Sequence, residues 1–273
     1  MAVNYSLKEI QKANKNFFGS SYYDSNIVFK NILRFKKKIQ NQNTNLINFF
    51  MKKTYIEKKK EDIDLIWSKK DFQIHINDIS KKGFTFVDSF FDEKSISIIK
   101  SIWPPDYFFY APDNPLKNYS FGFRYLNNQF LTYDDFDRCQ NFKKFYLYLL
   151  ADKFTNYINQ IIGAKNHKIL SIVASTAREK SYLIPHQDTI ISDNNIKNIV
   201  NVIFFVDGDN NAEFSGGTGI YQDNEFKEPI FIPPHIKNSA IIYNSKKNLF
   251  HGFDIMKKKT FRKAISFQLM EIK

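Results

Sequence analysis

Short apolar runs separated by turn residues fill the chain from Gly83 onward, and this pattern limits the fold more than any other feature of the sequence. The runs with strand-like composition cover residues 84–87, 169–174, 199–206, 219–221, 230–232, 240–243 and 263–269. Several short strands that follow helices indicate an antiparallel barrel or jelly roll with helices on one face. The fold class predicted from the sequence is therefore α+β.

Two segments within this region have helical rather than strand-like spacing. One begins near Asp92, where apolar residues recur at 96, 98, 99 and 102, and the other covers about 142–162. Before them, residues 5–79 also show apolar residues at helical spacing, as at 28, 32, 35 and 39 and again at 63, 66 and 67. We therefore predict an N-terminal helical extension, residues 1–79, and a β domain, residues 80–273.

The chain carries a formal net charge of +12, and the first 79 residues hold 15 basic and 8 acidic side chains, a net of +7. Nucleic acid is not the expected partner, because only five of the 40 basic residues are arginine, the residue best suited to phosphates and base edges. The helical extension has two interpretations, a docking surface for an acidic partner or a solvated layer packed on the β domain, and the second is preferred.

The location predicted from the sequence is cytoplasmic. Cys139 is the only cysteine, which excludes an internal disulfide and a cysteine-based zinc site. The chain shows no basic-then-apolar signal at its start and no run of about 18 apolar residues that would suggest a membrane span. The oligomeric state is not predicted.

One His-x-Asp sequence, formed by His186 and Asp188, follows a strand-like segment. Residues two apart on an extended chain point to the same side, so this imidazole and this carboxylate can chelate one metal ion. His251 lies downstream, after the run at 240–243. Two histidines and one carboxylate form the facial triad that leaves three positions of a non-haem iron open for a bidentate 2-oxo acid and dioxygen.

Arg262 lies eleven residues after His251, at the start of the last strand-like run. A 2-oxo diacid that chelates iron through its oxo acid end needs a buried bidentate cation for its distal carboxylate, which is the role we predict for Arg262. The neighbouring Lys263 is the alternative, but adjacent strand residues point to opposite faces, and Arg262 shares its face with Ala264 and Ser266.

The segment from Gly83 onward resembles the Fe(II)/2-oxoglutarate-dependent oxygenase superfamily, in the branch of the prolyl 4-hydroxylases. The similarity is carried by Val-Asp-Ser-Phe-Phe at 87–91, by Phe-Ser-Gly-Gly at 214–217, and by the stretch from the Pro-Pro pair at 233–234 to Tyr243. The resemblance implies a double-stranded β-helix core, also called a jelly roll, with flanking helices. It also implies iron ligands at His186, Asp188 and His251, and Arg262 on the C5 carboxylate of 2-oxoglutarate. Several relatives carry a serine where this chain has Ala264, so help from a hydroxyl there is not expected.

Other residues are weaker candidates for the site. Thr176 and Asn201 are candidates for co-substrate binding. Arg178, where relatives often carry a tyrosine, is a candidate for substrate binding, with a surface salt bridge as the equally weighted alternative. Arg124 and Tyr110 belong to a stretch, 104–124, that is either a substrate lid or an ordinary surface loop. The remaining histidines, at 75, 167 and 235, are expected to be structural.

The sequence thus predicts a dioxygenase that uses Fe(II), 2-oxoglutarate and O₂. The expected reaction is hydroxylation of a C–H bond in a small polar metabolite or biosynthetic intermediate, for which an anionic or carrier-tethered compound is one option. Three alternatives stay open: a hydroxylase of protein side chains of the prolyl type, a nucleic-acid demethylase, and a β-helix module that binds a ligand without turnover. The carboxylate at Asp188 argues against halogenation, because halogenating relatives have a small residue there.

Overall fold

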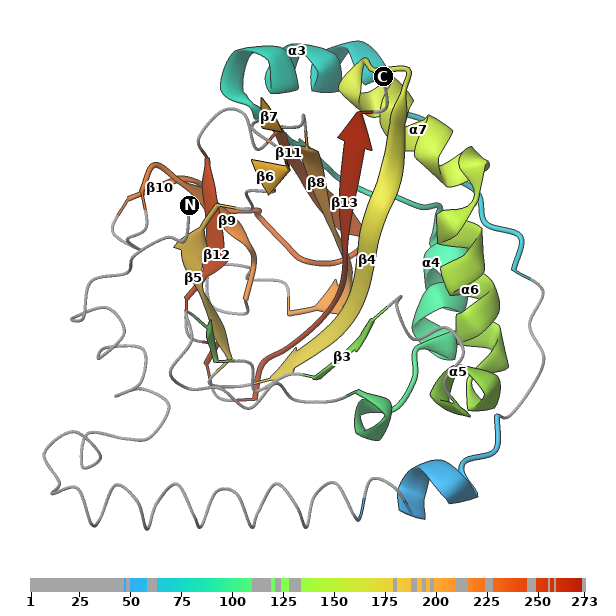
Figure 1. Cartoon of the computed structure of the whole chain (residues 1–273). Helices are drawn as coiled ribbons and strands as arrows, with labels where there is room; N and C mark the ends of the chain where they lie inside the picture. The colour runs from blue at the N-terminus through green and yellow to red at the C-terminus, as the bar shows by residue number, and fades with distance from the viewer. Residues whose placement is uncertain are drawn as a thin grey trace, which may run out of the picture.

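The computed structural model contains two antiparallel β-sheets and a layer of helices on one side of them (Figure 1). The structure describes residues 47, 50–57, 63–109, 119–120, 124–127, 134–178, 181–187, 191–192, 195–196, 199–209, 216–223, 228–244, 249–254, 256–257 and 259–271. Within this part of the chain, no helix is long and apolar enough to cross a membrane.

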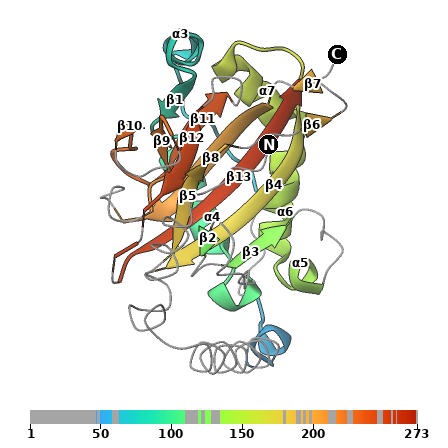
Figure 2. The same ribbon diagram turned by 60° about the vertical axis from the view of Figure 1, so that its left-hand side comes forward.

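The larger sheet has six strands in the order β1-β11-β8-β13-β4-β3. Its strands are β1 (Phe84–Val87), β3 (Arg124–Asn127), β4 (His167–Arg178), β8 (Ile199–Gly208), β11 (Ser239–Asn244) and β13 (Phe261–Glu271). Each strand is antiparallel to its neighbours. The long strand β13 pairs with β4 on one side and with β8 on the other, so it forms the centre of the sheet (Figure 2).

The smaller sheet has five strands in the order β10-β9-β12-β5-β2. Its strands are β2 (Tyr119–Ser120), β5 (Tyr182–His186), β9 (Gly219–Tyr221), β10 (Pro229–Phe231) and β12 (Phe250–Phe253). A separate pair is formed by β6 (Ile191–Ser192) and β7 (Asn195–Ile196). From β4 onward the chain crosses repeatedly between the two main sheets. The antiparallel β core predicted from the sequence is confirmed.

The two faces of the larger sheet pack against different partners, and alternation along each strand decides which residue faces which partner. On β11, Ala240 and Ile242 belong to the core shared with the helices, whereas Ile241 and Tyr243 belong to a second core shared with the smaller sheet. Ile220 of β9 is a member of this second core. We call the face toward the smaller sheet the inner face and the face toward the helices the outer face.

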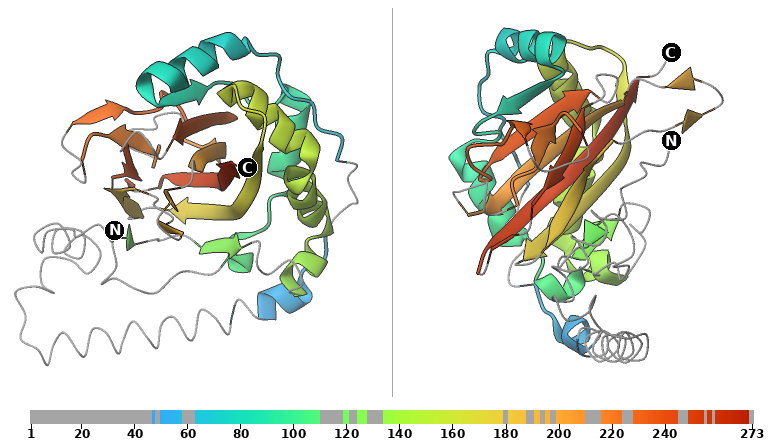
Figure 3. Two further views of the ribbon diagram at one scale, coloured as in Figure 1. Left: turned by 45° about the horizontal axis from the view of Figure 1, so that its top comes forward. Right: turned by 90° about the vertical axis from the view of Figure 1, so that its left-hand side faces the viewer.

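Helices cover the outer face (Figures 1 and 3). They are α3 (Phe72–Lys82), α4 (Glu93–Ile102), α5 (Asp134–Arg138), α6 (Gln140–Leu150) and α7 (Asp152–Ile162), with a short 3-10 helix, η2 (Asp106–Phe108), after α4. The helix predicted near Asp92 is confirmed as α4. Asp92 caps it by accepting a hydrogen bond from the backbone N–H of Ser95, and Ile96, Ile99 and Ile102 are buried on one side.

The single helix predicted over 142–162 is wrong, because the segment forms two helices. Ala151 lies between α6 and α7 with extended backbone angles, φ −73° and ψ 153°. Its backbone N–H bonds to the carbonyl of Tyr148, and its carbonyl accepts from the N–H groups of Phe154 and Thr155. Apolar spacing continues through this break, so periodicity alone did not reveal it.

Part of the N-terminal extension packs into the core of the β domain. The helical spacing predicted at 63, 66 and 67 is wrong, because residues 63–71 contain no helix. Trp67 instead forms an isolated β-bridge with Phe91, and its ring stacks on those of Phe91 and Tyr157 at 4.3 and 4.5 Å between centroids. Leu65 is also buried, at 1% exposure, and belongs to the core between the helices and the outer face of the larger sheet. The division of the chain at residue 79 stays a prediction.

Candidate active site between the two sheets

Two of the three predicted metal ligands are side by side in the smaller sheet. His186 ends β5, and His251 is its direct register partner on β12. Directly paired residues of antiparallel strands point to the same side, and the two imidazole rings are 4.1 Å apart between centroids, inclined at 49°. His251 is buried, and His186 is half-buried. Two imidazoles in this arrangement can share one metal ion.

Gly252 allows the close approach of β12 to β5 that brings the histidines together. A Cβ atom at this position would lie 2.4 Å from the carbonyl oxygen of Leu183 and 2.7 Å from the nitrogen of Pro185. Both contacts are with backbone, which cannot move aside as a flexible side chain could. A glycine is therefore required directly after His251 for these strands to pair as they do.

The third predicted ligand, Asp188, lies outside the described residues. Within the described part of the chain, no three His, Cys, Asp or Glu side chains form a group that could hold a metal ion. The structure thus places the two imidazoles but not the carboxylate, and the complete ligand set stays a prediction.

Arg262 lies on the inner face of the larger sheet and is 5% exposed. Its guanidinium carbon sits over the ring of Phe253 at 4.6 Å and over the ring of Phe205 at 5.2 Å, so the cation is held between two aromatic side chains from opposite sheets. One Nη donates a hydrogen bond to the carbonyl of Gly216 at 3.1 Å. Gly216 itself has φ +83°, which favours glycine at this turn.

Arg262 has no carboxylate partner among the described residues. Its Nε is buried and makes no hydrogen bond within that part of the chain. Burial lowers the pKa of Arg262 to about 9, and only Tyr243 acts in the opposite direction. The group is therefore still a cation at neutral pH, with an unused donor in an aromatic surrounding.

Tyr243 brings a side chain of the larger sheet next to the histidine pair. The centroid of its ring lies 4.8 Å from that of His251, and the two rings are inclined at 36°. Its electrostatic interaction with Arg262 raises the pKa of that guanidinium. It extends from the end of β11 on the inner face, so the larger sheet contributes a side chain to the surroundings of the histidine pair. The rings of His251 and Tyr243 are thus in contact between the sheets, and Arg262 lies on the same inner face.

Solved structures with the same architecture include three oxygenases. A prolyl-4-hydroxylase from Pseudomonas putida shares 10% identity over 74% of this chain and 99% of its own, with a TM-score of 0.50. An oxidoreductase of the 2OG-Fe(II) oxygenase family from Burkholderia pseudomallei shares 12% identity over 77% of this chain and 95% of its own, with a TM-score of 0.50. A prolyl hydroxylase from Trichoplax adhaerens was solved in complex with a peptide fragment of the hypoxia inducible factor oxygen degradation domain. It shares 14% identity over 75% of this chain and 94% of its own, with a TM-score of 0.50.

The chain has the fold of the 2-oxoglutarate/Fe(II) oxygenases. Two of these structures are prolyl hydroxylases, so the resemblance to that branch stated from the sequence is confirmed for the fold. No protein-family model matches the sequence, and a search of curated proteins finds no match. Because a fold hosts many reactions, the function has to be argued from the residues of the site.

Within this oxygenase fold, Thr176 is directed away from the site. It shares the outer face of β4 with Ile172 and Ala174, and its hydroxyl accepts a hydrogen bond from the indole N–H of Trp103 at 3.0 Å. Thr176 is 2% exposed on the helix side of the sheet. This placement does not suit co-substrate binding, because a full layer of sheet separates Thr176 from Arg262.

Asn201 is on the inner face, but far from Arg262 along the sheet. It pairs with Gln268 on β13 and with Tyr243 on β11. Gln268 is six residues from Arg262, a distance of about 20 Å along a strand. Asn201 is 2% exposed, and its Nδ2 has no hydrogen-bond partner among the described residues. It therefore lies beside Tyr243, at the other end of the site from the arginine.

The described residues place none of the three residues that we predicted to bind substrate in the site. Arg178 makes an ion pair with Asp106 of η2, with Nε donating at 2.8 Å, and the two side chains are 48% and 44% exposed. It thus forms the surface salt bridge that was the alternative interpretation. For Arg124 only the backbone is described, paired with Thr176, and Tyr110 is outside the described residues.

Sequence reasoning missed three aromatic residues of this site. Phe205 and Phe253 enclose Arg262, and Tyr243 contacts His251. Tyr243 and Phe253 did carry a signal, since Tyr243 ends the strand-like run before His251 and Phe253 lies two residues after His251. Phe205 lay within an uninterrupted apolar run, where nothing distinguishes an inner from an outer residue.

Proposed function

We propose that this protein is an Fe(II)/2-oxoglutarate-dependent dioxygenase that hydroxylates a C–H bond of a small polar molecule. The observation that carries the proposal is the buried cation Arg262, which has no carboxylate partner in the described chain and faces the same interior as the paired His186 and His251. The architecture shared with oxygenases supports it independently. Fe(II), 2-oxoglutarate and O₂ are the implied cofactor and co-substrates.

The surroundings of Arg262 fit a carboxylate of a small diacid. A guanidinium donates up to five hydrogen bonds in a planar fork, and here only one Nη donor has a partner that the structure shows. An unpaired cation costs free energy in a buried site, and an anionic ligand offsets that cost with charge-assisted hydrogen bonds. The rings of Phe205 and Phe253 hold the guanidinium plane and keep water from it.

His186, His251 and, by the proposal, Asp188 would hold the iron. Neutral imidazoles and a carboxylate suit Fe(II), and three protein ligands leave room for a chelating 2-oxo acid. When bound, the iron and its co-substrates supply the oxidising chemistry, with 2-oxoglutarate converted to succinate and CO₂. Tyr243 would fix the ring plane of His251, and Asn201, at the same end of the inner face, is a candidate to hydrogen-bond the oxo acid end or the substrate.

The finer fold assignment belongs to the same proposal. The larger sheet contains β4, β8, β11 and β13, and the smaller contains β5, β9, β10 and β12. A chain that alternates between two facing antiparallel sheets in this way forms a double-stranded β-helix, or jelly roll. Cytoplasmic location and a small-molecule substrate remain predictions of the sequence. Because the Trichoplax adhaerens prolyl hydroxylase was solved with a peptide, a protein side chain stays the alternative substrate.

An anaerobic titration of the metal-free protein tests the proposal. Fe(II) is added first and 2-oxoglutarate second, and the visible charge-transfer band of the iron-bound 2-oxo acid is recorded. We expect the band in wild type and its loss in Asp188→Ala. We expect Arg262→Ala to weaken the apparent affinity for 2-oxoglutarate by at least about a hundredfold, since a buried charge-assisted pair is removed.

The matched controls use an arginine outside the site and a shorter co-substrate. Arg178→Ala, which removes a half-exposed ion pair, should leave the band unchanged. With 2-oxobutyrate, which lacks the distal carboxylate, wild type and Arg262→Ala should bind equally weakly. Absence of the band from folded, iron-loaded wild type would refute the oxygenase and favour a β-helix module that binds a ligand without turnover.

A further inference from the structure

A row of polar side chains crosses the inner face of the larger sheet beside the histidine pair. The row consists of successive register partners on β11, β8, β13 and β4, which are Tyr243, Asn201, Gln268 and Ser171. Directly paired residues of antiparallel strands point to the same face, and neighbouring strands are about 4.8 Å apart, so the row is roughly 14 Å long. It begins at Tyr243, whose ring contacts that of His251. We call these four residues the polar row.

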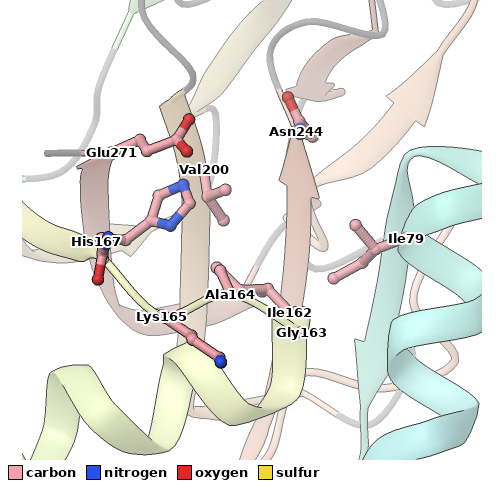
Figure 4. Close-up of a pocket in the computed structure, with 10 residues that line it drawn as sticks. Ile79, Ile162, Gly163, Ala164, Lys165, His167, Val200, Asn244 and Glu271 are labelled. Carbon is pink, nitrogen blue, oxygen red and sulfur yellow. The ribbon is translucent and has the colours of Figure 1, made fainter. Parts of the chain in front are cut away.

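The neighbours of the polar row in sequence face the helices. Val202, Phe267 and Ile172 belong to the core on the outer face. Val200 and Asn244 line a pocket of about 370 Å³ beside the C-terminal ends of α3 and α7 (Figure 4). Because side chains alternate along a strand, the polar row points away from this outer pocket and toward the space between the sheets.

Exposure rises from one end of the polar row to the other. Tyr243 and Asn201 are each 2% exposed, whereas Gln268 and Ser171 are half-buried. The row thus leads from an accessible edge of the inner face to the buried surroundings of His251. A substrate on its way to the proposed metal ligands needs such a path, with polar groups that fix its orientation.

Two amide groups in the middle of the row have N–H donors that the described residues leave unused. Nδ2 of Asn201 is buried and has no hydrogen-bond partner in that part of the chain. The hydroxyl of Ser171 donates to Oε1 of Gln268 at 3.0 Å, and Nε2 of Gln268 likewise has no partner among the described side chains. Asn201 and Gln268 are directly opposite each other, so their Cβ atoms are about 5 Å apart. A buried N–H without an acceptor costs free energy, and we therefore expect an acceptor between these amides.

The surroundings of the row suit an uncharged acceptor. On β4, β8, β11 and β13, the described inner-face residues from the row to Arg262 include no charged side chain other than Arg262 itself. Arg262 is about 20 Å from Gln268 along β13, and the proposed function assigns it to 2-oxoglutarate. An ion at the row would lose its hydration without meeting an opposite charge, whereas a carbonyl oxygen has much less hydration to lose.

We propose that the primary substrate is an uncharged molecule whose carbonyl oxygen accepts hydrogen bonds from Asn201 and Gln268. This inference rests on the proposed oxygenase function, because it names the substrate class of the same site. With the carbonyl held at the middle of the row, an apolar part of the same molecule extends past Tyr243 and places a C–H bond near His186 and His251. Anions and ammonium ions are disfavoured because their charge stays uncompensated.

Saturation-transfer NMR titrations of the metal-free protein test this with three probes that share one apolar body: 4-methylpentanamide, 4-methylpentanoate and 4-methylpentylamine. We expect wild type to bind the amide at least about tenfold more tightly than either ion. Gln268→Glu keeps the acceptor for Ser171 but removes the N–H donor, so amide affinity should fall about tenfold and ammonium affinity should rise. Asn201→Leu has a similar volume without the donor and should also weaken amide binding about tenfold.

Two control variants separate this site from the rest of the protein. Gln160→Glu makes the same change at an exposed position of α7 and should leave all three affinities unchanged. Ala164→Phe obstructs the outer pocket of Figure 4 and should leave amide binding unchanged, which excludes that pocket as the binding site.

Three results would each overturn the proposal: equal binding of the three probes, no amide binding to wild type, or amide binding that survives both Asn201→Leu and Gln268→Glu. Neither iron nor 2-oxoglutarate is present in these titrations. Failure of the oxygenase proposal, recorded as absence of the charge-transfer band, is therefore distinguishable from failure of the amide proposal.

Discussion

Replacing Arg262 by methionine should stabilise the metal-free, ligand-free protein. Burial lowers the pKa of Arg262 from its ordinary value above 12 to about 9. At 1.36 kcal/mol for each pKa unit, this corresponds to roughly 4 to 5 kcal/mol against the charged form in the folded state. A methionine fills a comparable space between Phe205 and Phe253 and carries no charge.

Two losses offset part of that gain. The carbonyl of Gly216 loses its donor, which costs about 1 to 3 kcal/mol when the group stays buried, and the two contacts with aromatic rings lose their cationic part, about 1 kcal/mol in total. The expected net effect of Arg262→Met is a gain of about 0 to 3 kcal/mol in the free energy of unfolding. Replacement of buried charges by apolar groups has this sign in other proteins.

Urea unfolding at pH 7 in the presence of a chelator measures this difference, with the fluorescence of Trp67 and Trp103 as the signal. Arg178→Met is the control, and its half-exposed ion pair should change the stability by less than about 1 kcal/mol. Added 2-oxoglutarate should stabilise wild type but not Arg262→Met. The reasoning fails if Arg262→Met is destabilised by more than about 1 kcal/mol, since the guanidinium would then have compensation that the described residues do not contain.

Three further predictions concern the same region. The affinity of wild type for 2-oxoglutarate, measured by calorimetry, should be constant up to about pH 9 and fall above it, because the lowered pKa of Arg262 removes the cation there. Gly252→Ala should lose the charge-transfer band and much of the thermal stability, since its Cβ would lie 2.4 Å from the carbonyl oxygen of Leu183. Trp103→Phe removes the donor to buried Thr176 and should cost about 1 to 3 kcal/mol in urea unfolding, with no change in 2-oxoglutarate affinity.

Much of the fold could be predicted from the sequence, because local spacing determines it. The apolar runs became strands of the two sheets, and Asp92 became the cap of α4. The alternation argument for Arg262 over Lys263 needed only the strand period, and in the structure Arg262 lies on the inner face while Lys263 pairs in register with Asp207 and Thr176. These inferences depend on neighbours within one strand or one helix.

The remainder depended on contacts between distant segments. Arg178 is paired with Asp106, 72 residues away, and no local pattern indicates that partner. Trp67 lies in an extended segment despite the helical spacing around it, and its ring stacks on those of Phe91 and Tyr157, which are 24 and 90 residues away. Thr176 was misplaced because the face of a strand residue depends on the register of the whole sheet.

Register also links the apolar core to the chemistry of the site. On β13, Ile265, Phe267 and Leu269 are buried against the helices, and this outer-face contact fixes which residues of the strand face inward. A slip by one residue would expose that apolar set and would exchange Arg262 for Lys263 on the inner face. A lysine there could neither stack between the two phenylalanine rings as a planar group nor hold a carboxylate bidentately. The residues that stabilise the helix side of the sheet therefore also select the cation presented to the candidate active site, although none of them touches it.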